Sequence, residues 1–207
     1  MIEKKYWIYL LIFLAVAIWS GIGAYEVGLW FLEAGICIVG VAVLIVTFKR
    51  FKFTDMTYFF ILIHLIILLV GAHYSYARVP LFDWIKEIFE QSRNNYDKVG
   101  HFVQGFIPAM IARELLIRLN VVCKKSWIPF FVVCICLAIS AFYELIEWWV
   151  AVLSGDGAEE FLGMQGYVWD TQSDMFCAMI GAICMLIFFS KLQDKQIRKI
   201  EDSDFNN

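Results

Sequence analysis

The residues best suited to chemistry are carboxylates and one histidine that recur at helical spacing. Three pairs of them lie three or four positions apart: Asp97 with His101, Glu144 with Glu147, and Asp170 with Asp174. Side chains at this spacing share one face of a helix, so each pair can present two donors to one ligand. Oxygen donors with one imidazole suit hard or borderline divalent cations, and we predict a site for Mg2+, Mn2+ or Zn2+ made from these six residues.

A cation at such a site would activate water and polarise a phosphoryl or acyl oxygen, with a spare carboxylate as general base. We predict that Glu147 and Asp174 take the catalytic roles in a metal-dependent enzyme. The expected substrate is a lipid or a lipid-linked head group at the outer leaflet. The sequence contains neither His-Glu-x-x-His nor Gly-x-Ser-x-Gly, so no hydrolase motif identifies the reaction.

Two other hypotheses stay open from the residues alone. The carboxylates could form the ion or proton site of a transporter or small-ligand binding protein, in one chain or in a dimer. They could also hydrogen-bond helix to helix and fix one packing, as buried polar residues in membranes often do. Metal content and the stability of variants distinguish the three hypotheses.

The elements that must position these residues are membrane-spanning helices. Of the 207 residues, 61% are hydrophobic and 18% are charged, whereas soluble domains carry about 25% charged residues. Several apolar blocks approach the roughly 20 residues that a helix needs to cross a bilayer. We predict an all-α fold, a polytopic membrane helix bundle forming a single domain over residues 1–207, with about six transmembrane helices at 7–24, 28–48, 58–77, 99–119, 127–153 and 172–190.

The fourth span, 99–119, is the most polar of the six. It carries His101 and Gln104 among its apolar residues, and we predict that it packs inside the bundle rather than against lipid. Glu114 and Arg118 lie four residues apart at its inner rim and are predicted to form an ion pair. A stripe of small residues on the sixth span predicts close helix packing there: Ala178, Gly181 and Ala182.

Basic residues are distributed unevenly between the connections. The N-terminus, the second and fourth connections and the C-terminal tail hold 12 of the 17 Lys and Arg residues, while the third connection holds four. Because cytoplasmic loops carry the excess of Lys and Arg, both termini are predicted to be cytoplasmic. The overall balance of 17 basic and 20 acidic residues favours no nucleic-acid partner.

The third connection, about residues 78–98, contains a pattern of its own. Apolar residues recur there at helical spacing: Leu81, Trp84, Ile85, Ile88 and Phe89. This pattern predicts a short amphipathic helix, either on the outer membrane surface or packed on the bundle as a lid. The fifth connection, about 154–169, is rich in Gly and acids and is predicted to cap the site.

The topology places all three pairs in the outer half of the membrane. Other polar residues expected near that depth are Glu26, Glu33, His73, Gln104, Tyr143, Gln165 and Gln172. Ionisable groups in a low dielectric must bind cations, share protons or meet partners. Because Arg113 and Arg118 lie towards the cytoplasmic end, we predict that no local bases balance this acidic layer.

Three strings resemble the bacterial YjdF-like inner-membrane proteins: YDKVGHFVQGFIPAMIARE, AFYELIEWWVA and FLGMQGYVWDTQSDMFCAMIGA. The resemblance implies a multi-pass protein of the bacterial inner (cytoplasmic) membrane, in contact with membrane lipid, and brings no assigned reaction. More loosely, the three acidic pairs followed by Ile180-Gly181-Ala182 are similar to VanZ-like membrane proteins, some of which are associated with glycopeptide-antibiotic tolerance. Those proteins are usually shorter, and the two leading spans here have no clear counterpart in them.

Overall fold

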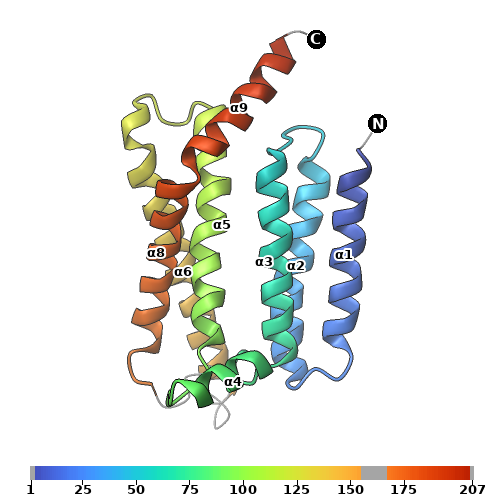
Figure 1. The fold of residues 1–207 in the computed structure, drawn as a ribbon, viewed down its shortest axis with the longest axis vertical. Helices are drawn as coiled ribbons and strands as arrows, with labels where there is room; N and C mark the ends of the chain where they lie inside the picture. Colours follow the sequence, from blue (N-terminus) through green and yellow to red (C-terminus); the bar gives the residue numbers. More distant parts are fainter. Residues whose placement is uncertain (1–2, 155–166, 206–207) are drawn as a thin grey trace.

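The computed structural model describes residues 3–154 and 167–205, and within these ranges every regular element is a helix (Figure 1). In chain order these helices are α1 (Lys4–Gly21), α2 (Val27–Thr47), α3 (Asp55–His73), α4 (Pro80–Ile88), α5 (Tyr96–Arg118), the short 3-10 helix η1 (Lys125–Trp127), α6 (Ile128–Ser154), α8 (Asp170–Phe188) and α9 (Ser190–Phe205). The predicted all-α helix bundle is confirmed.

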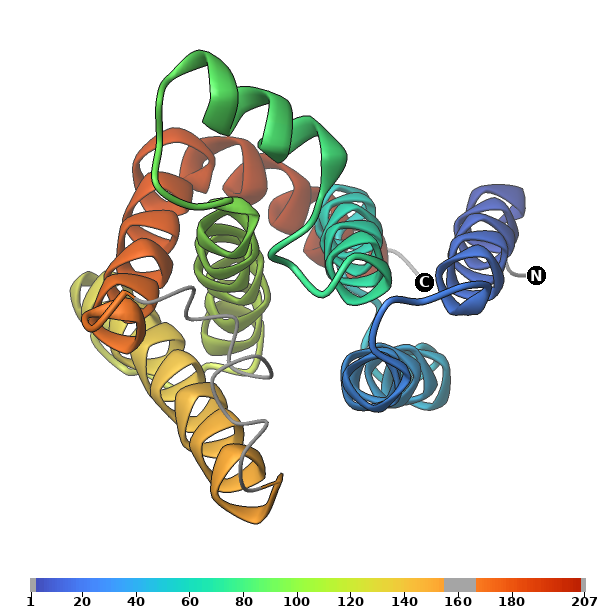
Figure 2. The same cartoon turned by 90° about the horizontal axis from the view of Figure 1, so that it is seen from below.

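Five of these elements are long and apolar enough to cross a membrane: α1, α2, α3, α6 together with η1, and α8. The remaining predicted span, the fourth at 99–119, corresponds to α5, which has 23 residues and packs against α3, α6 and α8 (Figure 2). Its polar side chains therefore meet other helices, which avoids much of the cost of facing lipid. This is the inner position that the sequence predicted.

The helix boundaries differ slightly from the predicted spans. α1, α3 and α5 each begin three residues before the apolar run that predicted them. At α3 the Thr54 hydroxyl accepts a hydrogen bond from the Thr57 amide, and Asp55 lies in the first turn. Polar residues stabilise the free N–H groups of a helix start, so helices extend beyond their apolar runs.

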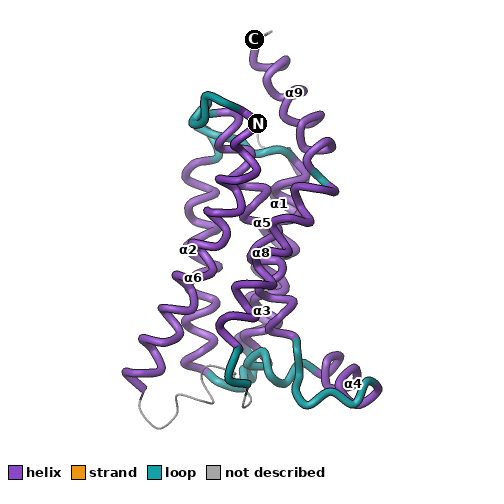
Figure 3. Tube along the Cα trace, turned by 90° about the vertical axis from the view of Figure 1, so that its left-hand side faces the viewer, coloured by secondary structure: helices purple, strands orange, loops and turns teal. Residues whose placement is uncertain are grey.

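The two chain ends lie together at one end of the bundle, and α4 crosses the other end (Figures 1 and 3). We call the first the terminal end, where Lys4 and Ser190 lie, and the second the α4 end, where residues 80–88 lie. Six passes of the chain bring both ends to the same side. The predicted common side of the termini is therefore reproduced.

The bundle consists of two groups of helices joined through α3 (Figure 2). In the first group α1, α2 and α3 enclose one apolar core, which contains Phe13, Ala34, Cys37, Leu62 and Leu69. In the second group α5, α6 and α8 enclose a larger core, whose buried members include Ile107, Met110, Val132, Cys136 and Met185.

α5 and α8 approach each other closely because small residues face across their contact. A methyl group added at Gly105 would overlap the backbone carbonyl of Ala178, and one added at Gly181 would overlap the carbonyl of Phe102. Ala178 and Ala182 are fully buried. The predicted small-residue stripe is thus confirmed, and it brings the acidic start of α8 against the start of α5.

The amphipathic helix predicted in the third connection is α4. Phe82 packs edge-on against Tyr96 of α5, whereas Leu81, Trp84, Ile88 and Phe89 are all more than half exposed. A lid packed on the bundle would bury this face. The exposure favours the alternative position on a membrane surface, where such a face contacts lipid.

Candidate cation site at the α4 end

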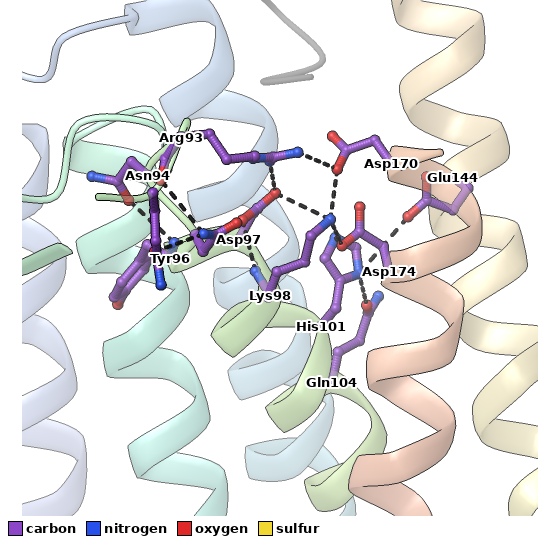
Figure 4. A network of polar contacts seen from close by, with 12 residues as sticks. Arg93, Asn94, Tyr96, Asp97, Lys98, His101, Gln104, Glu144, Asp170 and Asp174 are labelled. Carbon is purple, nitrogen blue, oxygen red and sulfur yellow. Dashed lines mark hydrogen bonds and ion pairs between the residues drawn. The ribbon is translucent and has the colours of Figure 1, made fainter. Parts of the chain in front are cut away.

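The predicted acidic pairs come together at the α4 end from three helices. α5 contributes Asp97 and His101 from its first two turns, α6 contributes Glu144, and α8 contributes Asp170 and Asp174 from its start (Figure 4). Asp170 and Asp174 are 5% and 4% exposed. The helical spacing in the sequence therefore identified residues that share one site.

Two bases lie within this acidic layer, contrary to the prediction that it has no local positive charge. Arg93 pairs with Asp97 and lies 2.6 Å from Asp170 through Nη1. The Lys98 ammonium lies 2.5 Å from Asp170 and 2.7 Å from Asp174. The prediction was wrong because it counted both bases only as part of the third connection, whereas their side chains point into the acidic layer (Figure 4).

The His101 imidazole lies between two carboxylates on neighbouring helices. Its Nδ1 is 3.8 Å from Glu144 Oε1, and its Nε2 is 3.8 Å from Asp174 Oδ1. Nδ1 also lies 2.9 Å from Gln104 Oε1, which can accept its proton and so leave Nε2 as the lone-pair donor. His101 therefore has the second partner that metal-binding histidines usually have.

One oxygen of this group lacks a partner. Glu144 is 8% exposed, and although Thr171 hydrogen-bonds its carboxylate, Oε1 is buried without a hydrogen-bond partner among the described residues. A buried acceptor left unpaired costs about 1–3 kcal/mol, and more when it is charged. Oε1 faces His101, as Figure 4 shows.

Glu114, near the terminal end of α5, shows how this fold treats a structural carboxylate. Both oxygens are bonded: Oε1 to the Thr54 amide and Arg118, and Oε2 to the hydroxyls of Thr54 and Thr57. The predicted Glu114–Arg118 ion pair is confirmed at 2.9 Å. Glu144 differs from Glu114, because its Oε1 has no hydrogen-bond partner among the described residues.

Two groups of side chains bring their donor atoms close enough to share a cation. His101, Glu144 and Asp174 have donor atoms within 4.8 Å of one another, as do Asp97, Asp170 and Asp174. Two ligands of one ion, each about 2.0–2.2 Å from it, are separated by about 3–3.5 Å. The 3.8 Å between His101 Nε2 and Asp174 Oδ1 needs only a small adjustment to reach this, and Glu144 lies within 4.8 Å of the other two donors. Lys98 already supplies a positive charge to the second group.

A cavity of about 210 Å³ adjoins these residues. Its polar lining comes from Glu33, His64, Ser75, Tyr76, Asp97, His101, Gln104, Tyr143, Glu147, Asp170 and Asp174. Apolar residues also line it: Leu29, Ile36, Leu68, Pro108 and Ile139. The cavity is therefore lined by polar and apolar residues together, and Ile36, Pro108 and Ile139 form an apolar part of its wall.

Glu33 joins the first group of helices to this cavity. Its carboxylate accepts hydrogen bonds from the hydroxyl groups of Tyr143 and Tyr76, the second at 2.9 Å. The bond from Tyr143 connects α2 to α6, two helices that are otherwise little in contact. Of the additional polar candidates, Glu33, Gln104 and Tyr143 thus belong to the site region.

Other predicted candidates lie away from the cavity. Glu26 and Gln172 are exposed, and His73 bonds the carbonyl of Ser20 and packs against Trp19. The predicted topology puts these residues at about the same membrane depth as the site, but their side chains do not face the cavity. Gln165 and most of the predicted cap at 154–169 lie outside the described residues.

Sequence reasoning missed four residues of this region: His64, Tyr76, Arg93 and Lys98. Arg93 lies four positions before Asp97 in the connection that leads into α5, close enough in the sequence to pair with it. His64 lies near the middle of an apolar span, where any ionisable residue indicates a function or a paired role. These two signals were present in the sequence.

Comparison with known proteins gives the family of the chain. A family model described as "Predicted membrane protein (DUF2238)" matches residues 5–195. The chain belongs to this family. The chain is also similar to "Inner membrane protein YjdF" of Escherichia coli (strain K12), being 46% identical to it over 184 residues, which cover 89% of this chain and 88% of that protein. No solved structure matches the chain.

Membership of the DUF2238 family confirms the YjdF-like resemblance and the multi-pass membrane character. Residues 5–195 include every side chain of the site region, from Glu33 to Asp174. The looser similarity to VanZ-like proteins stays a prediction.

Proposed function

We propose that this DUF2238 protein binds a divalent cation at its α4 end through His101, Glu144 and Asp174. The observation that carries the proposal is the buried Glu144 Oε1, which has no hydrogen-bond partner among the described residues and faces His101. A bound cation would satisfy this oxygen. One imidazole and two carboxylates form a donor set suited to Zn2+, Mn2+ or Mg2+.

The charge balance of the region supports a cation. Arg93 and Lys98 contact three carboxylates, those of Asp97, Asp170 and Asp174. Glu33, Glu144 and Glu147 add further acidic groups around the same cavity or beside it. Acids therefore outnumber bases, and a divalent ion reduces their mutual repulsion.

We expect the purified protein to hold about one divalent ion per chain after loading, and His101→Ala and Glu144→Gln to lose it. Removal of a direct ligand should weaken binding by at least the roughly 10–100-fold that loss of an outer-shell partner costs. Elemental analysis after dialysis against each ion measures the content. Glu26→Gln is the matched control, because Glu26 is exposed and away from the cavity.

Three results would contradict this proposal. Retention of the ion by both site variants would place the cation elsewhere. A metal-free protein whose stability depends on monovalent ions or protons would favour the transport hypothesis. A metal-free protein whose two site variants simply unfold more readily than Glu26→Gln would favour the structural hypothesis.

Hydrolysis of a lipid or lipid-linked substrate is a second candidate function, favoured by the position of Glu147. This carboxylate lines the same cavity as His101 and Asp174 but does not belong to the three-residue donor group. It could serve as a general base beside a cation that polarises a phosphoryl or acyl oxygen. The apolar part of the cavity, which Ile36 and Ile139 line, suits an acyl or isoprenoid chain.

We propose that the α4 end faces the extracytoplasmic side, because 12 of 17 basic residues belong to the terminal end. Cys123 is exposed in the connection at the terminal end. A membrane-impermeant maleimide is expected to label it only after cell lysis, and to label Glu87→Cys on α4 in intact cells. Cys123→Ser provides the background. Labelling of Cys123 in intact cells would reverse the orientation.

A further inference from the structure

A second cavity, separate from the cation site, lies among α1, α2 and α3 near the terminal end. It encloses about 500 Å³, and nearly all of its lining is apolar or aromatic. The lining includes Leu10 and Phe13 of α1, Val41 and Leu44 of α2, and Leu65 of α3. We call it the α1–α3 groove. Because all three helices are membrane spans by length and composition, an apolar hollow between them meets hydrocarbon rather than water.

The groove extends through only part of one leaflet of the membrane. On α1 its lining runs from Tyr6 to Phe13, which is about 10 Å of helix rise, and a whole hydrocarbon core is about 30 Å thick. Phe13 and Leu62 also belong to the buried core of this helix group, which closes the groove towards the middle of the bundle. The groove is therefore blind and does not form a path across the membrane.

Several basic residues lie at the mouth of the groove, and two of them are paired with carboxylates. Lys5 pairs with Glu3 at 2.8 Å and Asp55 at 2.6 Å, and Lys52 pairs with Glu3 at 2.7 Å. These two ammonium groups hold the pKa of Glu3 below its usual value. Lys49 lines the groove.

Lys49 and its neighbour Arg50 differ from these paired lysines. Both are exposed, and no ion pair among the described residues includes either of them. Aromatic side chains of the interfacial type surround the same mouth, with Tyr6, Trp7 and Tyr9 in the lining. A blind apolar groove with cations and aromatic residues at its opening has the layout of a site for an amphiphile with an anionic head.

We propose that the α1–α3 groove holds an acyl chain of an anionic phospholipid from the leaflet at the terminal end, with the lipid phosphate at Lys49 and Arg50. The apolar lining accounts for the chain, and the unpaired bases account for the head group. A Lys or Arg close to the membrane surface attracts the negative charge of an anionic lipid head group and so strengthens the binding of that lipid.

The test uses the full chain, purified in detergent, depleted of lipid and then titrated with phosphatidylglycerol or with phosphatidylcholine of the same acyl chains. Native mass spectrometry counts the lipids bound per chain. We expect one tightly bound phosphatidylglycerol and about fivefold weaker binding of phosphatidylcholine. Lys49→Gln should weaken phosphatidylglycerol binding by a similar factor, whereas Lys124→Gln, in the exposed connection after α5, should have no effect.

A groove-filling variant tests the site of the acyl chain. Val41→Trp places an indole in the groove and should abolish tight lipid binding. Val43→Trp is the matched control, because Val43 lies on the same helix, is 55% exposed and does not line the groove. Equal binding by the two Trp variants would overturn the groove as the site. Equal binding of phosphatidylglycerol and phosphatidylcholine would overturn the proposal that an anionic head group is recognised. If the protein is a dimer and only Val41→Trp abolishes the dimer, the occupant of the groove is a second copy of the chain.

Discussion

Replacing Lys98 with methionine is expected to lower the free energy of unfolding by about 3–5 kcal/mol. The Lys98 ammonium joins α5 to α8 through Asp170 and Asp174, whose side chains are 7% and 6% exposed. Methionine retains most of the side-chain volume but removes the positive charge, so the two carboxylates lose a shared partner in a site with little water. Thermal unfolding in detergent micelles should show a Tm lower by roughly 10 °C.

Lys86→Met provides the matched control for Lys98→Met, because Lys86 lies on α4 and no ion pair of the described residues includes it. Its Tm should stay close to that of the unmodified protein. Adding Asp174→Asn to Lys98→Met should recover part of the loss, since it neutralises a stranded carboxylate. Equal Tm values for Lys98→Met and Lys86→Met would show that the network does not stabilise the fold.

Helical spacing predicted much of the fold and part of the site. The interval from Asp97 to His101 and the small residues around Gly181 follow one helix face, and a helix face is determined within a single element. These local patterns were sufficient to place α5 inside the bundle and to predict close packing of α8 on its neighbours. That the neighbour is α5 is seen only in the structure.

Partners that come from distant parts of the chain could not be predicted in this way. Tyr76 and Tyr143 reach Glu33 from 43 and 110 residues away, and no periodicity relates such positions. Arg93 is directed inward by a connection whose path depends on Asn94, which bonds the Val79 carbonyl and the Asp83 side chain. Positive-charge counting treats all basic residues of a connection alike, and therefore it did not distinguish Arg93 and Lys98 from the other bases of the third connection.

Which of the predicted candidate residues face the site could be decided only from the folded structure. Glu26 and His73 lie at the same depth as the site but point elsewhere. Depth follows from topology, whereas direction around the helix axis follows from packing. The unpaired Glu144 Oε1 depends on every neighbour that could have bonded it, so the observation that supports a cation site exists only in the folded structure.

If the hydrolase candidate is correct, Glu147→Gln is expected to lower turnover by about 10²–10⁴-fold while leaving the metal content unchanged. Glutamine preserves the shape of the side chain but cannot accept a proton from water at neutral pH. Glu147 lies three residues from Glu144 on the same helix, so it faces the same region. It lines the cavity that His101 and Asp174 also line. In this arrangement Glu147 acts as the base, and His101, Glu144 and Asp174 act as the cation ligands.

The measurement is the cation-dependent release of phosphate or head groups from a total bacterial lipid extract in mixed micelles, followed by mass spectrometry. Glu26→Gln, an exposed Glu-to-Gln change away from the cavity, should retain full turnover. Absence of release by the metal-loaded protein would contradict the hydrolase candidate and leave cation binding as the function. A residue that acts only as a general base does not determine the metal content of the protein. Loss of the metal in Glu147→Gln would therefore show that Glu147 is a ligand, as in the six-residue metal site predicted from the sequence.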